Sequence, residues 1–250
     1  MKGWTVCGVL SLLMWGTTWA HFHTFIPDNP YGRRGRSVNY TYFWGHPYEH
    51  VVFDTPRPVS LFALTPRGKK VDLMGTLKKH GKGYMFSYTP RELGDHIICL
   101  DAPPIFVEEE GVFWEDHVKQ VLHVMAQKGW DRATGQKIEL VPLTRPYGIE
   151  AGFVFQAQVL FKGRPLPGAT VEVEKYHERP VPEDELPDEP MVTRVVRTDP
   201  NGVVTFTLDE PGWWIMCAYA EGGTKEYEGR SYPVELRGGL WVYVEKPFSQ

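Results

Sequence analysis

Apolar and polar residues alternate along several short stretches of the chain, as in strands that bury one face. Residues 170–174 and 204–208 alternate with a period of two, and the Asp-Pro-Asn-Gly turn at 199–202 lies between them. A Pro-Gly pair at 211–212 opens another apolar run, and residues 241–244 supply a last one. Short strands separated by Pro and Gly turns predict a β-sandwich rather than a parallel sheet.

The first half of the chain has the same character. Turn signals at Pro66-Arg-Gly68 and His80-Gly81 separate its strand-like runs. We expect strands at residues 37–44, 59–64, 84–88 and 96–100. These runs predict a second small sandwich.

The two halves share a local similarity. Residues 94–102 (GDHIICLDA) align without a gap on residues 212–220 (GWWIMCAYA), an offset of 118 residues. Cys99 and Cys217 therefore occupy the same place in equivalent strands. We expect two unpaired thiols, each buried in a separate core.

The segment between the halves predicts a short helix, because Val118, Val121, Leu122 and Met125 fall on one helical face. Acidic residues precede this run and Lys128 follows it, as the helix dipole favours. The expected fold is all-β, with two β-sandwich domains of immunoglobulin-like or transthyretin-like type and a short connecting helix. The expected boundaries are a signal peptide at 1–20, an N-terminal sandwich at 21–104, a connecting segment at 105–140 and a transthyretin-like sandwich at 141–250.

The first twenty residues have the pattern of a secretory signal peptide. Lys2 precedes an apolar run at 6–15, and Thr18-Trp-Ala20 is a small-residue cleavage pattern. The apolar run is roughly half of the ~20 residues that span a bilayer, and no later run is long enough. We therefore expect a periplasmic protein without a transmembrane segment in the mature chain. The formal net charge of −4 is too small and too mixed to predict a nucleic-acid partner.

Cleavage after Ala20 would make His21 the first residue and His23 the third. A third-position histidine allows the amine, two backbone amides and one imidazole to form a square-planar set, which Cu(II) and Ni(II) prefer. Alternatively, the amine and the His21 ring chelate the metal as a brace and another imidazole completes the site. Both alternatives depend on this cleavage.

A second histidine group follows the first strand, where Gly45-His-Pro-Tyr-Glu-His50 places His46 and His50 on a turn. Imidazole suits Zn(II), Cu(II), Ni(II) and Co(II). We predict a metal site formed by His21, His23, His46 and His50.

The spacing of His46, Glu49 and His50 also matches the H-x-x-E-H pattern of a peptidase, which requires a helix. Pro47 and the strand-like surroundings disfavour that helix, so we expect no enzyme activity and no catalytic residues. The remaining histidines, His80, His96, His117, His123 and His177, have surface or packing roles as readily as metal-binding ones.

The chain resembles a known family on four segments. These are the processed start His-Phe-His-x-Phe-Ile-Pro, the Gly-His-Pro-Tyr-Glu-His strand end, the run at 137–143 and the turn at 163–169. They are similar to an exported family of unknown function described as the periplasmic component of cobalt/nickel uptake systems. The resemblance implies handling of Ni(II) or Co(II) beside a membrane transporter.

The function we expect is capture of a divalent transition metal, nickel or cobalt, and its delivery to the membrane subunit of an uptake transporter. The alternative is an extracytoplasmic structural or carbohydrate-binding module. In that case Trp44, Trp114 and Trp130 would contribute to a sugar-stacking face.

Overall fold

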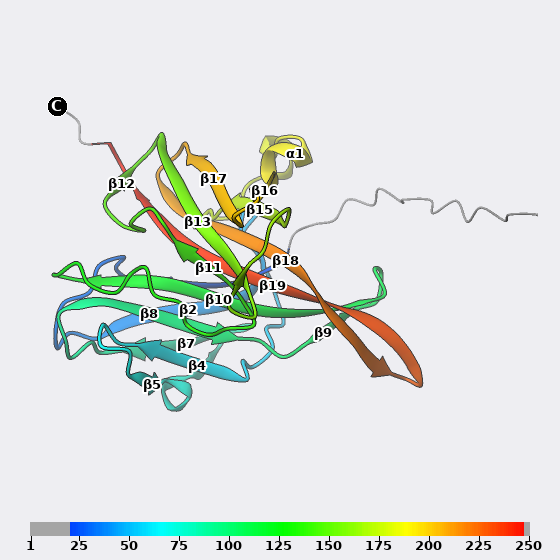
Figure 1. The fold of residues 1–250 in the computed structure, drawn as a ribbon, viewed down its shortest axis with the longest axis horizontal. Coiled ribbons are helices and arrows are strands. Elements are labelled where there is room, and N and C mark those ends of the chain that lie inside the picture. Colours follow the sequence, from blue (N-terminus) through cyan, green and yellow to red (C-terminus); the bar gives the residue numbers. More distant parts are fainter. Residues whose placement is uncertain (1–20, 248–250) are drawn as a thin grey trace, which may run out of the picture.

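The computed structural model describes residues 21–247, which form strands in three sheets with few helical turns (Figure 1). This confirms the predicted all-β class. The expected signal peptide at 1–20 lies outside the described residues. Within 21–247 there is no helix with the length and apolar character needed to cross a membrane.

The strands of the three sheets and the helical elements have the following bounds. The five-stranded sheet holds β1 (Phe22–Pro27), β2 (Val38–His46), β3 (Val51–Phe53), β6 (Lys78–His80) and β7 (Gly83–Tyr88). The ten-stranded sheet holds β4 (Ser60–Leu64), β5 (Lys70–Asp72), β8 (Gly94–Asp101), β9 (Ile105–Val107), β10 (Val112–Val124), β12 (Ile149–Glu150), β15 (Thr170–Lys175), β16 (Arg194–Arg197), β18 (Gly212–Tyr227) and β19 (Arg230–Glu245). The four-stranded sheet holds β11 (Ile138–Pro142), β13 (Phe153–Phe161), β14 (Arg164–Pro165) and β17 (Val203–Leu208). The helical elements are α1 (Glu189–Val192) and two 3-10 turns, Met74–Thr76 and Glu183–Glu185.

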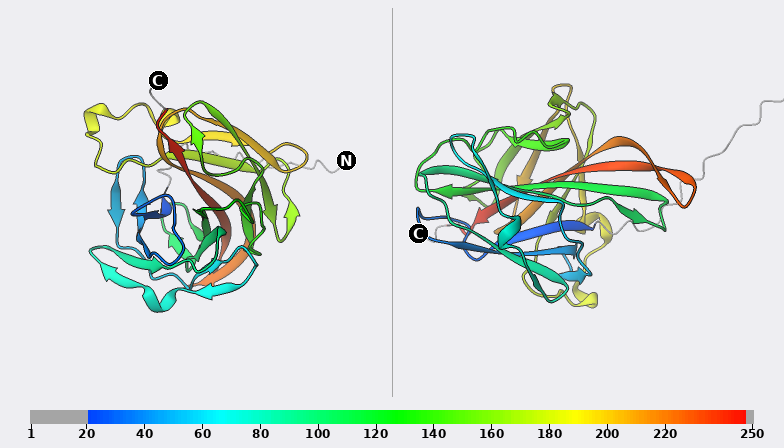
Figure 2. Two further views of the ribbon diagram at one scale, coloured as in Figure 1. Left: turned by 90° about the vertical axis from the view of Figure 1, so that its left-hand side faces the viewer. Right: turned by 90° about the horizontal axis from the view of Figure 1, so that it is seen from below.

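One sheet runs through both of the units that the sequence predicts. Its order is β16-β15-β18-β19-β10-β8-β4-β5, so strands from both halves of the chain lie side by side in it. The junction is the parallel pairing of β10 with β19, which Figure 1 shows at the centre of the molecule. Beyond this body the β18–β19 hairpin extends as a long exposed ribbon (Figure 2).

The shared sheet separates two apolar cores, and β18 contributes to both. Trp213, Ile215 and Cys217 belong to the core against the five-stranded sheet. Trp214 and Met216 belong to the core against the four-stranded sheet. This alternation is the period-two pattern of a strand buried on both faces. The first core therefore contains side chains from the C-terminal half of the chain.

The predicted connecting helix at 118–125 is wrong, because residues 118–124 are part of the 13-residue strand β10 and Met125 follows its end. β10 lies between β8 and β19 and is buried on both faces, so apolar residues occur on both sides of the strand. A fully buried strand has no clean alternation, and its apolar residues can fall by coincidence at helical spacing. Val118 and Leu122 pack into one core, whereas Val121 joins a third cluster with Phe62 and Tyr147.

Three polar side chains of β10 pair with residues on other segments. His117 Nδ1 lies 2.7 Å from Asp101 Oδ1, Lys119 Nζ 2.5 Å from Glu139 Oε2, and His123 Nδ1 2.7 Å from Asp95 Oδ1. A buried charge is tolerated in a strand when such a partner is present. These pairs link β10 to β8, through Asp95 and Asp101, and to β11, through Glu139.

Cys99 and Cys217, the cysteines within residues 21–247, are free and buried, as predicted. Cys217 lies in the first core and Cys99 in the third cluster, so the two thiols are in different apolar clusters as expected. Cys217 does not face a core of the C-terminal half alone, because the first core also contains N-terminal residues. The strands that carry them begin alike, with Gly94 at φ 128° and Gly212 at φ 118°. The two similar segments thus form two strands, β8 and β18, of the same ten-stranded sheet.

Candidate metal centre

His21 and His46 lie against each other where β1 and β2 begin and end. The antiparallel register pairs Phe22 of β1 with Gly45 of β2. The next residues beyond these two, His21 and His46, therefore face each other. Their ring centroids are 4.4 Å apart, with an interplanar angle of 56°. The structure therefore brings together two of the four predicted ligands.

Gly45 is required for this arrangement. A Cβ at this position would lie 1.9 Å from the carbonyl oxygen of Val51 on β3, an impossible contact with backbone. β3 approaches closely enough to place Phe53 with its ring centroid 5.2 Å from that of His46 and 5.1 Å from that of His21. The glycine before His46 thus allows the third strand to close over the histidine pair.

Aromatic rings and a buried arginine fix His21. Its ring centroid lies 5.2 Å from that of Trp44 and 5.4 Å from that of Trp114. A guanidinium nitrogen of Arg237 donates a hydrogen bond to the His21 carbonyl oxygen. The Nδ1 atom of His21 is buried and has no hydrogen-bond partner among residues 21–247. An unpartnered buried nitrogen is costly unless something binds it.

Burial makes the His21 imidazole neutral. Desolvation, with smaller contributions from His46 and from the positive charge of Arg237, lowers the pKa of His21 from 6.5 to about 4. The neutral imidazole is the form that binds metal ions, so no proton has to be displaced from this ring at neutral pH.

His23 lies one step further along the same face of β1 and is fully buried. Its Nδ1 lies 2.8 Å from the hydroxyl oxygen of Tyr42, and its Nε2 lies 3.6 Å from Asp116 Oδ2. Its carbonyl oxygen accepts a hydrogen bond of 3.1 Å from the indole of Trp241. Desolvation first, and Arg237 second, lower the pKa of His23 to about 3. His23 is held inside the core behind the histidine pair.

Asp116 and Arg237 form the charged pair beneath the site, and the sequence analysis missed both. Arg237 Nε lies 3.0 Å from Asp116 Oδ1, and the two side chains are 1% and 2% exposed. The guanidinium also lies 4.2 Å from the ring centroid of Trp114. The available signal was weak, because other charged residues stand close to both in the sequence: Glu115 precedes Asp116, and Glu235 is two residues before Arg237. The sequence also does not reveal that the strands carrying them pair with each other.

His50 points away from this pair. Its Nδ1 lies 2.8 Å from the carbonyl oxygen of His177, and its ring is near Phe43 and Tyr176. Phe43 is on the opposite face of β2 from Trp44 and His46. His177 in turn donates its backbone N–H to Pro47 at 3.0 Å. These contacts attach the turn after His46 to the segment that follows β15.

The turn at 47–50 is not helical, as Pro47 and Gly45 predict. His46 and His50 therefore do not share a helix face, which the peptidase pattern requires. Glu49 is buried, and desolvation raises the pKa of its carboxyl group. The absence of enzyme activity remains a prediction.

Among the described residues, no group of three or more histidine, cysteine or acidic side chains is arranged to hold a metal ion. A metal ion on the His21–His46 pair would therefore need a donor that is not a side chain. The amine that cleavage after Ala20 would create on residue 21 is such a donor. The orphaned Nδ1 of His21 fits this group, because amine and Nδ1 of one histidine close a chelate ring around a metal ion.

The amide-based alternative fits the structure poorly. It requires the backbone nitrogens of residues 22 and 23 and the His23 ring to surround one ion. β1 instead holds these residues extended against β2, and the His23 ring is inside the core. Forming the amide set would detach the start of β1 and expose His23.

The tryptophans of the carbohydrate-binding alternative do not form one face. Trp44 and Trp114 surround His21, whereas Trp130 packs against the third cluster with Phe62 and Tyr147. A sugar-stacking surface built from all three is therefore not present.

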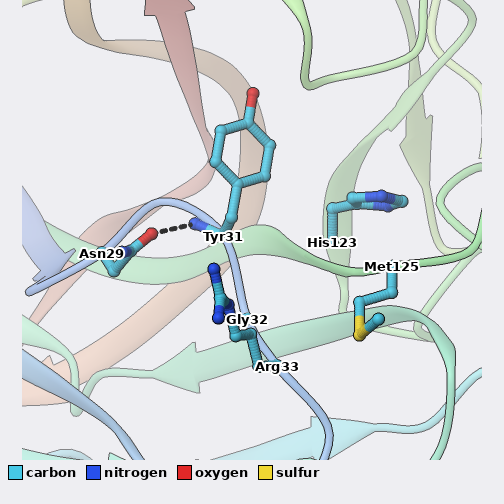
Figure 3. Close-up of a pocket in the computed structure, with 6 residues that line it drawn as sticks. All are labelled: Asn29, Tyr31, Gly32, Arg33, His123 and Met125. Carbon is cyan, nitrogen blue, oxygen red and sulfur yellow. Dashed lines mark hydrogen bonds between the residues drawn. The ribbon is translucent and has the colours of Figure 1, made fainter.

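His123 lines a separate cavity of about 350 Å³, with Tyr31, Arg33 and Met125 among its neighbours (Figure 3). Its ring stacks on Tyr147 with centroids 4.1 Å apart, and Asp95 holds its Nδ1. His96 bonds to Tyr88, and His117 to Asp101. These contacts link β8 to β7 and to β10.

Residues 18–222 match the family described as a domain of unknown function, DUF4198, so the chain belongs to this family. A comparison with curated proteins gave no match.

Solved structures with related architecture are distant. A DUF4785 family protein from Legionella pneumophila is 12% identical with a TM-score of 0.33, over 79% of this chain and 52% of that one. The chain thus spans about half the length of the Legionella protein. Trypsin-activated alpha-2-macroglobulin from Escherichia coli is 11% identical with a TM-score of 0.30, over 91% of this chain and 16% of that one. The Yersinia pseudotuberculosis adhesin InvE is 12% identical with a TM-score of 0.27, over 89% of this chain and 59% of that one. TM-scores of this size give no guidance on function.

Proposed function

We propose that this protein captures a divalent transition metal ion outside the cytoplasmic membrane and delivers it to the membrane subunit of an uptake transporter. The metal is held by the His21 ring, the amine of a chain that begins at His21, and His46. The observation that carries the proposal is the unpartnered, buried Nδ1 of His21 beside the His46 ring at a centroid distance of 4.4 Å.

The donor set supports a nitrogen-preferring ion. Two imidazoles and an amine suit Ni(II), Co(II), Cu(II) and Zn(II), and carboxylates that would favour Mg(II) or Ca(II) are not part of it. The family resemblance favours nickel or cobalt as the physiological cargo. Because Cu(II) binds most nitrogen sites more tightly than Ni(II) or Co(II), affinity in vitro does not identify that cargo.

The surroundings support a site that loads and releases its ion. The aromatic rings of Trp44, Phe53 and Trp114 exclude water from one side of His21 and restrict its ring. A set of three nitrogens leaves coordination positions open to a donor from a partner. Open positions allow the ligands to be exchanged one at a time during transfer.

Proton competition should occur mainly at the amine. The His21 ring is neutral down to about pH 4. An α-amine has a pKa of roughly 7.7 to 8.0. Affinity should therefore fall about tenfold per pH unit below that range.

The test begins with the secreted protein purified without chelators. Native mass spectrometry should give the mass of residues 21–250 together with one bound metal ion. Titrations with Ni(II), Co(II) and Cu(II) should then be repeated on a chain with one alanine placed before His21. This variant retains every side chain but moves the amine away from the His21 ring. Its affinity should be at least about 10-fold lower.

Two further variants separate the histidines. His46→Ala should weaken binding to the same extent, whereas His50→Ala, whose ring faces His177, should leave it nearly unchanged. Full affinity in the alanine-extended chain would refute the amine-based site. Absence of binding in the unmodified mature chain would refute the function.

A further inference from the structure

A strongly basic pocket lies at the end of β10 that is remote from His21. It has a volume of about 290 Å³, and Arg34, Arg67, Arg91 and Lys128 line it together with Glu92. The basic residues come from four separate segments of the chain. Glu92 pairs with Arg67 at 3.2 Å, and Arg67 is 79% exposed.

Backbone hydrogen bonds hold these segments in place. Gly35 donates its N–H to Pro90 at 2.7 Å, which joins the loop of Arg34 to the loop of Arg91. The backbone N–H of Asp95 donates a hydrogen bond of 2.9 Å to the Lys128 carbonyl oxygen. The backbone N–H of Lys128 donates one of 2.6 Å to the Asp95 carboxylate.

Pro66, the neighbour of Arg67, is fixed as well. It packs against Gly94, where a Cβ would lie 2.6 Å from its ring. Arg132 also donates a hydrogen bond of 3.2 Å to the Pro66 carbonyl oxygen. The cationic side chains therefore project from an ordered framework of loops.

The charge of the pocket is not balanced by other residues within 21–247. Arg34, Arg91 and Lys128 have no carboxylate within ion-pair distance among residues 21–247, and Glu92 is the one acidic residue in the lining. The whole chain has a net charge of −4, so this concentration of positive charge opposes the overall balance. Gathering like charges costs free energy that a bound anion would recover.

We propose that this pocket binds a phosphate group. Guanidinium groups present paired N–H donors that match phosphate oxygens, and several of them around one cavity favour a multiply charged oxyanion over a single carboxylate. A phospholipid headgroup and free phosphate share this chemistry.

The pocket is separate from the candidate metal centre. Lys128 follows the Val124 end of β10, whereas Trp114, at the other end, lies beside His21. Ten residues of strand span about 33 Å. A phosphate bound in the pocket therefore leaves the His21–His46 pair accessible, and loss of one site does not imply loss of the other.

The test compares two probes on the full mature chain. Inorganic phosphate is titrated calorimetrically, and vesicles of phosphatidylglycerol are compared with vesicles of phosphatidylcholine and with phosphatidylcholine vesicles made anionic by oleate. The triple variant Arg34→Gln, Arg91→Gln, Lys128→Gln should lose binding by at least about 10-fold. The matched control Arg164→Gln, Arg230→Gln, Lys246→Gln removes the same charge from other exposed positions and should retain it.

Each outcome decides the proposal. Binding of free phosphate without vesicle binding identifies a soluble ligand, and selective binding of phosphatidylglycerol over oleate vesicles identifies a headgroup. Equal binding of both anionic vesicles without phosphate binding would overturn the proposal, because it shows attraction to charge alone. Equal losses in the two triple variants, or no binding of any probe, would also overturn it.

Discussion

Arg237 donates a hydrogen bond to the carbonyl oxygen of His21, although 216 residues separate them in the chain. The same guanidinium pairs with Asp116, and all three residues lie at the junction of β1, β10 and β19. The last long strand of the protein thus fixes the orientation of the residue that would begin the mature chain. This relationship makes the candidate metal centre dependent on the complete fold.

Arg237→Met should lower the free energy of unfolding by about 3–5 kcal/mol, because Asp116 would remain buried without a compensating charge. Chemical denaturation with urea measures this change. The exposed pair Arg194 and Asp209 provides the control, and Arg194→Met should cost less than about 1 kcal/mol. A similar small effect for both variants would show that the Asp116–Arg237 pair does not stabilise the fold.

Gly45→Ala should destabilise the protein by about 2 kcal/mol or more, since the new Cβ meets the Val51 carbonyl at 1.9 Å. It should also weaken metal binding, because β3 and Phe53 must move from the histidine pair. Gly75→Ala is the matched control, with no atom within 4 Å of its added Cβ. Thermal unfolding and metal titration of the two variants test the prediction, and equal behaviour would contradict it.

Acid should destabilise the protein through His23. Its pKa is about 3 in the folded chain and 6.5 when unperturbed, so between these values the unfolded chain binds more protons than the folded chain. The free energy of unfolding therefore falls as pH falls, by about 2 kcal/mol from this residue between neutral pH and pH 5.

The measurement for His23 is urea denaturation at several pH values. His23→Gln should lower the dependence of the unfolding free energy on pH by the equivalent of about one proton. His80→Gln, at the exposed end of β6, should leave that dependence unchanged. An unchanged slope in His23→Gln would show that another group accounts for the acid sensitivity.

Both cysteine thiols should be unreactive in the native protein and fully reactive in denaturant without reductant. Burial raises the pKa of the Cys99 and Cys217 thiols, and the thiolate is the reactive form. Thiol titration of the mature chain should therefore find two groups in urea. Finding none, with a mapped bond between Cys99 and Cys217, would contradict their positions in separate cores.

The sequence predicted much of the local structure, since a half-buried strand such as β2 shows its alternation directly and the short apolar run of β8 also favours a strand. The predicted runs at 37–44, 59–64, 84–88 and 96–100 correspond to β2, β4, β7 and β8. The failure at 118–125 has a physical cause, because β10 is buried on both faces and its polar residues are neutralised by distant partners. Neither feature is visible in a local window.

By itself the sequence determined the all-β class, the positions of most strands and the concentration of histidines near residue 21, because these follow from short-range periodicity and residue type. Only the tertiary structure decided which histidines meet. Strand register placed His46 opposite His21, the alternation of β1 placed His23 in the core, and the turn after Pro47 directed His50 to His177. The positions of these side chains depend on burial and on contacts with residues more than one hundred positions away, such as His177 and Arg237. No local sequence pattern shows such long-range contacts.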